Sequence, residues 1–141
     1  MAISAQEVNK LRQITGAGMM DCKVALTESN GDFDLAIELL RKKGQKVSEK
    51  RADRETKEGT VFIQSNADNS LAVLVAIGCE TDFVAKNDDF QNLGKAVLSV
   101  AYEKQPASID ELKALKAGNL AVGEKVTDLV GKIGEKIDVI A

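Results

Sequence analysis

The sequence predicts an α+β protein: three short N-terminal helices, a charged linker, and a small antiparallel sheet packed by helices. Apolar residues recur at helical spacing in the first 44 residues, whereas two β-type runs flank a polar turn further along. The stretch between them mixes charges and holds a single large aliphatic residue. We therefore divide the chain into a three-helix domain (residues 1–45), a linker (46–58) and an α+β subdomain (59–141).

The first helix has a clear start and end. Ser4 and Glu7 form a capping-box pair, in which each side chain satisfies a free backbone N–H of the first turn. Three apolar residues then follow at helical spacing: Val8, Leu11 and Ile14. The segment Gly16-Ala17-Gly18 ends the helix, because two glycines within three residues favour a turn.

Two further helices complete the N-terminal part. The second is expected from Met20 to Ser29, where Asn30-Gly31 ends it. Asp32 is a good N-cap for the third helix, since its carboxylate accepts a bond from a free N–H. Gly44 is placed to end this helix.

The second half begins with a β-hairpin. Thr60–Gln64 and Leu71–Ile77 are strand-like runs, and the polar residues 65–70 between them are typical of a turn. The second run is continuously apolar, which predicts a strand buried on both faces.

Four elements are expected after the hairpin: a helix over 88–103, a short helix after residue 108, a helix over 122–133 and a strand over 137–141. Ser108 and Glu111 form a second capping-box pair ahead of the short helix. Gly134 is placed to stop the helix that precedes the last strand.

Composition excludes several classes of function. The chain has no histidine, so Ser-His and Cys-His catalysis and histidine metal sites are excluded. The net charge is −3 and no segment has the basic excess that binding a phosphate backbone requires, so we expect no direct nucleic-acid contact. No apolar run approaches the roughly 20 residues that span a bilayer.

The two cysteines indicate a reducing compartment. Cys22 and Cys79 lack metal-ligand spacing, and no secretory signal is visible, so we expect a cytoplasmic protein with free thiols. Neither thiol has an activating base beside it, and buried structural cysteines are the favoured interpretation.

The segment Thr15–Lys23 combines a glycine-rich turn with two methionines. It follows a helix and lacks the Gly-Lys-Ser/Thr ending of a phosphate-binding loop, so an interhelical turn is favoured over a phosphate site. Methionine is adaptable and frequent at partner-binding surfaces. Residue type favours one buried and one exposed methionine without deciding between Met19 and Met20.

The run from Cys79 to Asp88 is the most informative stretch of the chain. It contains or adjoins four carboxylates: Glu80, Asp82, Asp88 and Asp89. Such clusters hold Mg²⁺ in phosphohydrolases, but the chain shows no base or pocket signature to accompany one. Helix capping is the favoured alternative, by Thr81 or Asp82 at one N-terminus and by Asn87 or Asp88 at the next. We therefore expect no catalytic, cofactor or metal residues.

Phe83 lies where the chain leaves the strand, directly after an acidic residue. Composition alone favours a core position for this aromatic side chain. The alternative is that Phe83 is presented to a partner with Asp82 beside it.

Two stretches, Thr15-Gly16-Ala17-Gly18-Met19-Met20-Asp21-Cys22-Lys23 and Thr81-Asp82-Phe83-Val84-Ala85-Lys86-Asn87, resemble the two signatures of bacterial elongation factor Ts. The resemblance extends to Gly31-Asp32 and to Lys132-Ile133-Gly134-Glu135. It implies a ubiquitin-associated-like (UBA-like) three-helix domain followed by the first core subdomain, with the second subdomain of the family missing.

The resemblance also implies a function. Members of that family exchange guanine nucleotide on elongation factor Tu, so this chain is expected to bind its nucleotide domain and promote GDP release. Six residues are then expected at the contact: Thr81, Asp82, Phe83, Val84, Met19 and Met20. The alternative is a non-catalytic interaction module that binds another protein. The sequence makes no prediction of oligomeric state.

Overall fold

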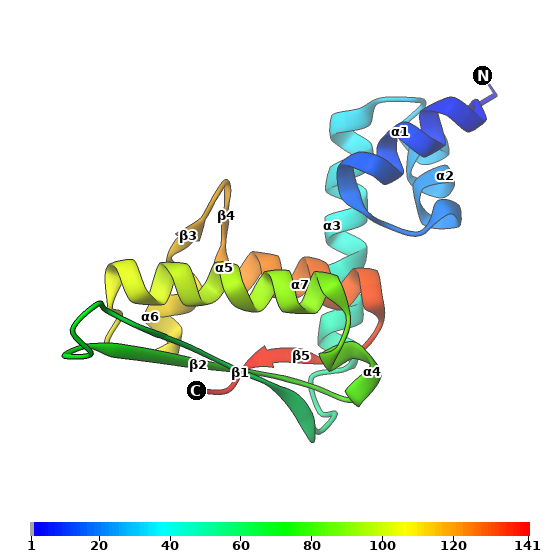
Figure 1. Ribbon diagram of the computed structural model, residues 1–141. Helices are drawn as coiled ribbons and strands as arrows, with labels where there is room; N and C mark the ends of the chain where they lie inside the picture. The colour runs from blue at the N-terminus through cyan, green and yellow to red at the C-terminus, as the bar shows by residue number, and fades with distance from the viewer. Residues whose placement is uncertain (1) are drawn as a thin grey trace.

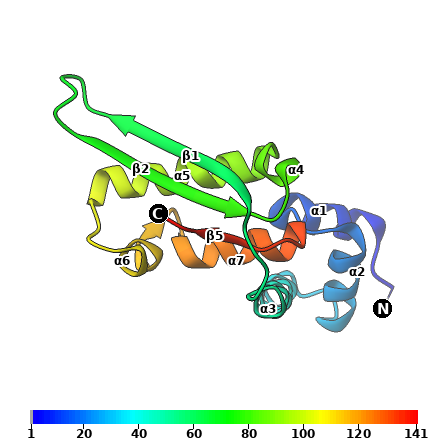
Figure 2. The ribbon, with the colours of Figure 1, turned by 90° about the horizontal axis from the view of Figure 1, so that it is seen from below.

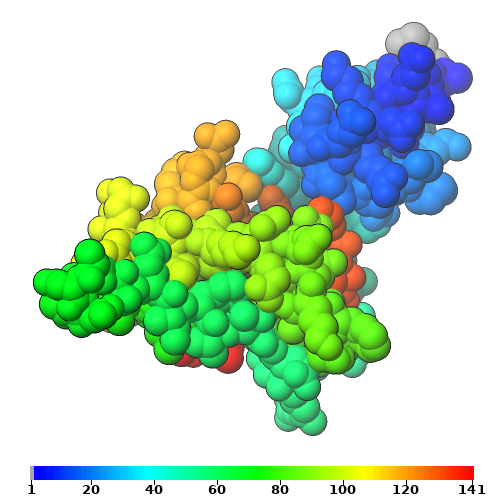
Figure 3. Space-filling view, in the orientation of Figure 1, coloured from blue at the N-terminus to red at the C-terminus, as the bar shows by residue number. Residues whose placement is uncertain are grey.

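The computed structural model describes residues 2–141, and over this range it contains seven helices, a three-stranded sheet and a two-stranded ribbon (Figure 1). The predicted α+β class is confirmed. In the space-filling view the first helices form a lobe beside a larger body that holds the sheet (Figure 3).

The N-terminal lobe consists of α1 (Ala5–Thr15), α2 (Met19–Glu28) and the first half of α3 (Phe33–Lys50). The capping box between Ser4 and Glu7 is present, and Gly16 ends α1 in the left-handed conformation with φ 68°. Asp32 caps α3 through the backbone N–H of Leu35. The lobe has its own small core: Val8, Leu11, Cys22, Ala25, Leu26 and Ala36.

The predicted end of α3 at Gly44 is wrong. The helix continues through this glycine to Lys50, so residues 46–50 of the predicted linker are helical. Gly44 is buried where α3 crosses α7 (Val122–Ile133), close to the Cα atom of Gly131. This glycine therefore lies inside the helix, at a helix crossing, and not at a helix end. The domain boundaries themselves stay a prediction.

The sheet consists of β1 (Glu58–Ser65), β2 (Ala72–Cys79) and β5 (Ile137–Val139), in the antiparallel order β1-β2-β5. The predicted hairpin and terminal strand are therefore confirmed. Helices α5 (Asp88–Lys104) and α7 lie on one side of this sheet, as the view from below shows (Figure 2).

The expectation that the second hairpin strand is buried on both faces is wrong. Phe62 and Val75 pair across the strands and are buried, whereas the next pair, Ile63 and Leu74, is exposed. Alternate residues of a strand face opposite sides of the sheet, and the helices cover one side. Burial on both faces is confined to the later part of β2, beside β5.

The remaining helices follow the predicted spacing. Ser108 caps α6 (Ile109–Ala114), Gly134 ends α7, and α5 covers the predicted segment. The one-turn helix α4 (Asp82–Ala85) starts at the N-terminus that the capping interpretation of Thr81 indicated. The ribbon of β3 (Lys116–Ala117) and β4 (Leu120–Ala121) was not predicted. The core of this part is centred on fully buried side chains: Phe90, Ile77, Val97, Val122 and Val130.

None of the helices within residues 2–141 is both long and apolar enough to cross a membrane.

Candidate functional site

The turn that follows β2 presents an aromatic side chain to solvent. Thr81 caps the one-turn helix α4, and its hydroxyl accepts a bond from the backbone N–H of Val84 at 3.4 Å. Within α4, the side chain of Phe83 is 81% exposed, whereas that of Val84 is 8% exposed. Successive residues of a helix turn by about 100°, so one side chain faces water and the next enters the core.

The interpretation of Phe83 as a core residue, which composition favours, is therefore wrong. Phe83 is the most exposed of the large apolar side chains in the described part of the chain. Its neighbours account for this, because Val84 and Ala85 occupy the space beneath α4. Of the six predicted contact residues, Val84 is thus buried, and Thr81 is half-buried and donates its hydroxyl to Glu135.

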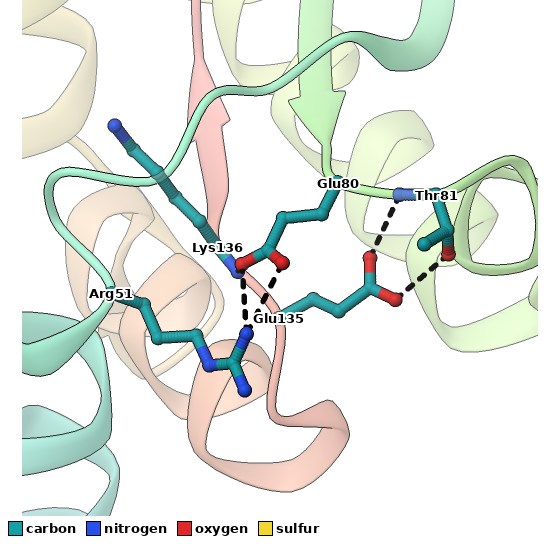
Figure 4. A network of polar contacts seen from close by, with 5 residues as sticks. All are labelled: Arg51, Glu80, Thr81, Glu135 and Lys136. Carbon is teal, nitrogen blue, oxygen red and sulfur yellow. Dashed lines mark hydrogen bonds and ion pairs between the residues drawn. The ribbon is translucent and has the colours of Figure 1, made fainter.

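Glu135 holds the N-cap of α4 in place. Its carboxylate accepts two bonds from Thr81, one from the backbone N–H at 3.0 Å and one from the hydroxyl at 2.7 Å (Figure 4). The Thr81 hydroxyl therefore donates to Glu135 while it accepts from Val84. Glu135 follows α7 by two residues, so the turn after β2 is tied to the turn after α7.

A second carboxylate completes this network. Glu80 accepts the backbone N–H of Lys136 at 2.8 Å and the guanidinium of Arg51 at 3.1 and 3.2 Å (Figure 4). The Lys136 N–H, and to a smaller extent Arg51, hold the pKa of Glu80 below its usual value. Because Arg51 follows the last residue of α3, three segments distant in sequence fix the base of α4.

The other acidic residues of this region are paired or lie at helix starts. Asp82 pairs with Lys86 at 3.6 Å, and Asp89 pairs with Lys132 at 2.8 Å. Asn87 caps α5 through the N–H groups of Asp89 and Phe90. The capping interpretation is confirmed, with Thr81 and Asn87 as the two caps. Among residues 2–141, no group of three or more acidic or cysteine side chains is arranged to hold a metal ion.

Cys22 and Cys79 are both buried, as the sequence predicts. Burial, reinforced by the nearby charge of Glu135, raises the pKa of Cys79 to about 11. The thiol donates to the carbonyl oxygen of Thr81 at 3.2 Å. Cys79 is thus part of the packing beneath the turn and is not activated for chemistry.

A second exposed apolar surface lies at the start of α2. The glycine-rich segment forms the turn between α1 and α2, as predicted, and Gly18 precedes the helix. Met19 and Met20 are 51% and 68% exposed. The expectation that one of the two is buried is therefore wrong, because Cys22, Ala25 and Leu26 fill the lobe's core from α2.

Sequence reasoning missed the residues that support the turn. Arg51, Glu80, Glu135 and Lys136 are brought together only by the fold, from positions up to 85 apart in the chain. Glu135 does fall in a segment that carries the family resemblance, but no local pattern links it to Thr81.

Comparison with known proteins agrees with the resemblance to elongation factor Ts. A family model described as elongation factor TS matches residues 80–140, which include α4 and Glu135. The elongation factor Ts of Amoebophilus asiaticus is 57% identical over 141 residues, covering all of this chain and 51% of that protein. Those of Cytophaga hutchinsonii and Christiangramia forsetii are 56% and 53% identical, covering 97% of this chain and 50% and 49% of their own lengths. The chain thus spans about half the length of the curated relatives it matches.

Proposed function

Because this chain is related along its whole length to the elongation factor Ts family, we propose that it acts in translation elongation as a guanine-nucleotide exchange factor. In this proposal it binds the nucleotide domain of elongation factor Tu and promotes the release of GDP. The observation that carries the proposal is the exposure of Phe83 on a turn fixed by several hydrogen bonds.

The proposed mechanism needs no covalent chemistry. Asp82 and Phe83 insert between helices of elongation factor Tu near its Mg²⁺ site, which weakens the hold of the ion on the β-phosphate of GDP. Met19 and Met20 pack on another part of the nucleotide domain. The exposed carboxylate and aromatic ring at the tip of α4 suit insertion into a partner.

The energies are compatible with this mechanism. Burying a Phe side chain contributes about 1.5–3 kcal/mol, whereas a nucleotide held at nanomolar affinity is bound by about 12 kcal/mol. Exchange requires only that binding of this chain weakens the binding of GDP to elongation factor Tu. A coupling free energy of about 1–3 kcal/mol between the two lowers the affinity for GDP roughly 5–150-fold. The fixed turn lowers the entropy cost of insertion, because Phe83 is already presented.

The proposal is tested by stopped-flow release of labelled GDP from elongation factor Tu. The chain should accelerate release, and Phe83→Ala or Asp82→Ala should reduce the acceleration about tenfold, within the usual range of coupling. Ile63→Ala is the matched control, since it removes an apolar side chain that is 64% exposed on the hairpin. Equal acceleration by Phe83→Ala and by the unchanged chain would contradict the proposed role of the turn.

The alternative is a non-catalytic interaction module that binds another protein. The chain spans about half the length of the relatives it matches. Binding to elongation factor Tu without faster GDP release at saturating concentration would support this alternative. The same titration therefore separates the two functions.

A further inference from the structure

Helix α3 contacts both hydrophobic cores of the molecule. Its first half contributes Ala36 to the core of the N-terminal lobe, where Ile37 and Leu40 also pack. Its second half places Val47 against the core of the sheet-containing body. Both contacts lie on one uninterrupted helix, because the 18 residues of α3 extend over about 27 Å without a break.

Two glycines meet where α3 and α7 cross. Gly44 and Gly131 face each other, and a Cβ atom added at Gly131 would overlap the Cα atom of Gly44. A Cβ atom added at Gly44 would instead lie 3.4 Å from the carbonyl oxygen of Thr127, which is an ordinary contact distance. Because backbone atoms cannot move aside singly, Gly131 sets how closely the two helices approach.

A second contact ties the lobe to the body. The side chain of Lys132 lies against Gly16 in the turn between α1 and α2, and its ammonium group pairs with Asp89 of α5 at 2.8 Å. Gly16 is three residues before Met19, so this contact is close to the exposed methionines. Within the lobe, Lys43 of α3 also pairs with Asp21 of α2.

We infer that the α3–α7 crossing at Gly44 and Gly131 holds Met19–Met20 at a fixed position relative to Asp82–Phe83, so that both surfaces engage a single partner together. The identity of the partner rests on the proposed function. The geometry rests on the α3–α7 crossing and on the contact of Lys132 with Gly16. Gly131 is then a positioning residue. Two surfaces held in a matching arrangement bind as one bivalent unit, whereas a mobile lobe would lower the effective concentration of the second contact.

The geometry is tested first in the isolated chain. Spin labels at Lys23→Cys on α2 and Lys95→Cys on α5 occupy exposed positions, whereas the native thiols are buried. Electron–electron distance measurements should give one narrow distribution for the labelled chain and for its Gly44→Ala variant. Gly131→Ala should shift or broaden it. A broad distribution in the parent chain would overturn the inference.

The consequence for binding is tested with the same pair of variants. Both add one methyl group to a helix interior and gain the same intrinsic helix propensity, so their difference reports the crossing. The concentration of chain that gives half-maximal acceleration of GDP release should be at least tenfold higher for Gly131→Ala than for Gly44→Ala. The rate of release at saturating concentration should be the same for both variants. Lys132→Ala, which leaves the crossing intact, should give a smaller loss in the same direction.

Equal behaviour of the two glycine variants in both measurements would overturn the inference. If the parent chain gives a narrow distance distribution but no acceleration of release, the proposed function fails while the fixed geometry stands. Truncating Met19 and Met20 to alanine should also weaken binding less in Gly131→Ala than in the parent, because the two surfaces no longer act together.

Discussion

Among single residues, Asp128 shows how burial alters an ionisable group. It lies in a hollow of about 290 Å³ between α3 and α7, together with Arg41 and Lys132. Burial raises the pKa of Asp128; Arg41 opposes this rise, and the charge of Glu124 adds to it. Since the pKa in the folded protein is above that of the unfolded chain, the ionised carboxylate costs stability at neutral pH.

We therefore expect Asp128→Asn to raise the melting temperature at pH 7. The gain should shrink as the pH falls through the raised pKa of Asp128 towards 3.8, because the wild-type carboxyl group is then protonated too. Thermal unfolding followed by circular dichroism at a series of pH values measures this. Asp53→Asn, in an exposed turn, corrects for the change in net charge. A gain that stays constant with pH would contradict the assignment to this carboxyl group.

Among the elements, α4 depends on a residue outside itself. Glu135→Ala removes both acceptors of Thr81 and should loosen the turn that carries Phe83. The chain has no tryptophan, so Phe83→Trp supplies a single reporter at this position. Adding Glu135→Ala should lower the fluorescence anisotropy of that tryptophan, and Glu135→Gln should lower it less, because the amide oxygen still accepts one bond. Glu103→Ala, on the exposed end of α5, should leave it unchanged.

The packing of α5 on the hairpin gives a sharper steric test. A Cβ atom at Gly94 would overlap the ring of Phe62, whereas one at Gly123 of α7 would meet its nearest atoms at 3.4 and 3.5 Å. We expect Gly94→Ala to lower the free energy of unfolding by about 1–3 kcal/mol, as overpacked cores do. Urea unfolding measures this. Gly123→Ala should be neutral or stabilising, and an equal loss in both variants would contradict the packing argument.

The elements differ in how far the sequence predicts them. Caps at Ser4, Asp32 and Ser108 depend on residues three positions away, so local pattern suffices. The role of Gly44 depends on a residue 87 positions later in the chain, and the pattern alone indicates a helix end. For the site, the resemblance indicated Phe83 and the methionines, whereas Glu135 and Arg51 required the fold.

For the molecule as a whole, the shared helix predicts cooperative unfolding. Leu11 is fully buried in the lobe, and Leu11→Ala should cost about 2–5 kcal/mol. The single tyrosine, Tyr102, lies on α5 in the body and reports on that part alone. Because α3 contributes Ala36 to the lobe's core and packs Val47 against the core of the body, Leu11→Ala should also lower the melting temperature seen by Tyr102 fluorescence. An unchanged Tyr102 transition would show that the lobe unfolds independently.

Because α3 is continuous, its length also determines the rotation of the lobe about the helix axis relative to the body. Inserting one residue between Leu40, the last α3 residue that packs on the lobe's core, and Gly44 would rotate the lobe by about 100° around the helix axis and advance it by about 1.5 Å. An insertion of seven residues would nearly restore the angle but would carry the methionines about 10 Å further away. Among related chains we therefore expect insertions and deletions in the hairpin turn at residues 66–70, where they leave the orientation of the lobe relative to the body unchanged. We expect none within α3.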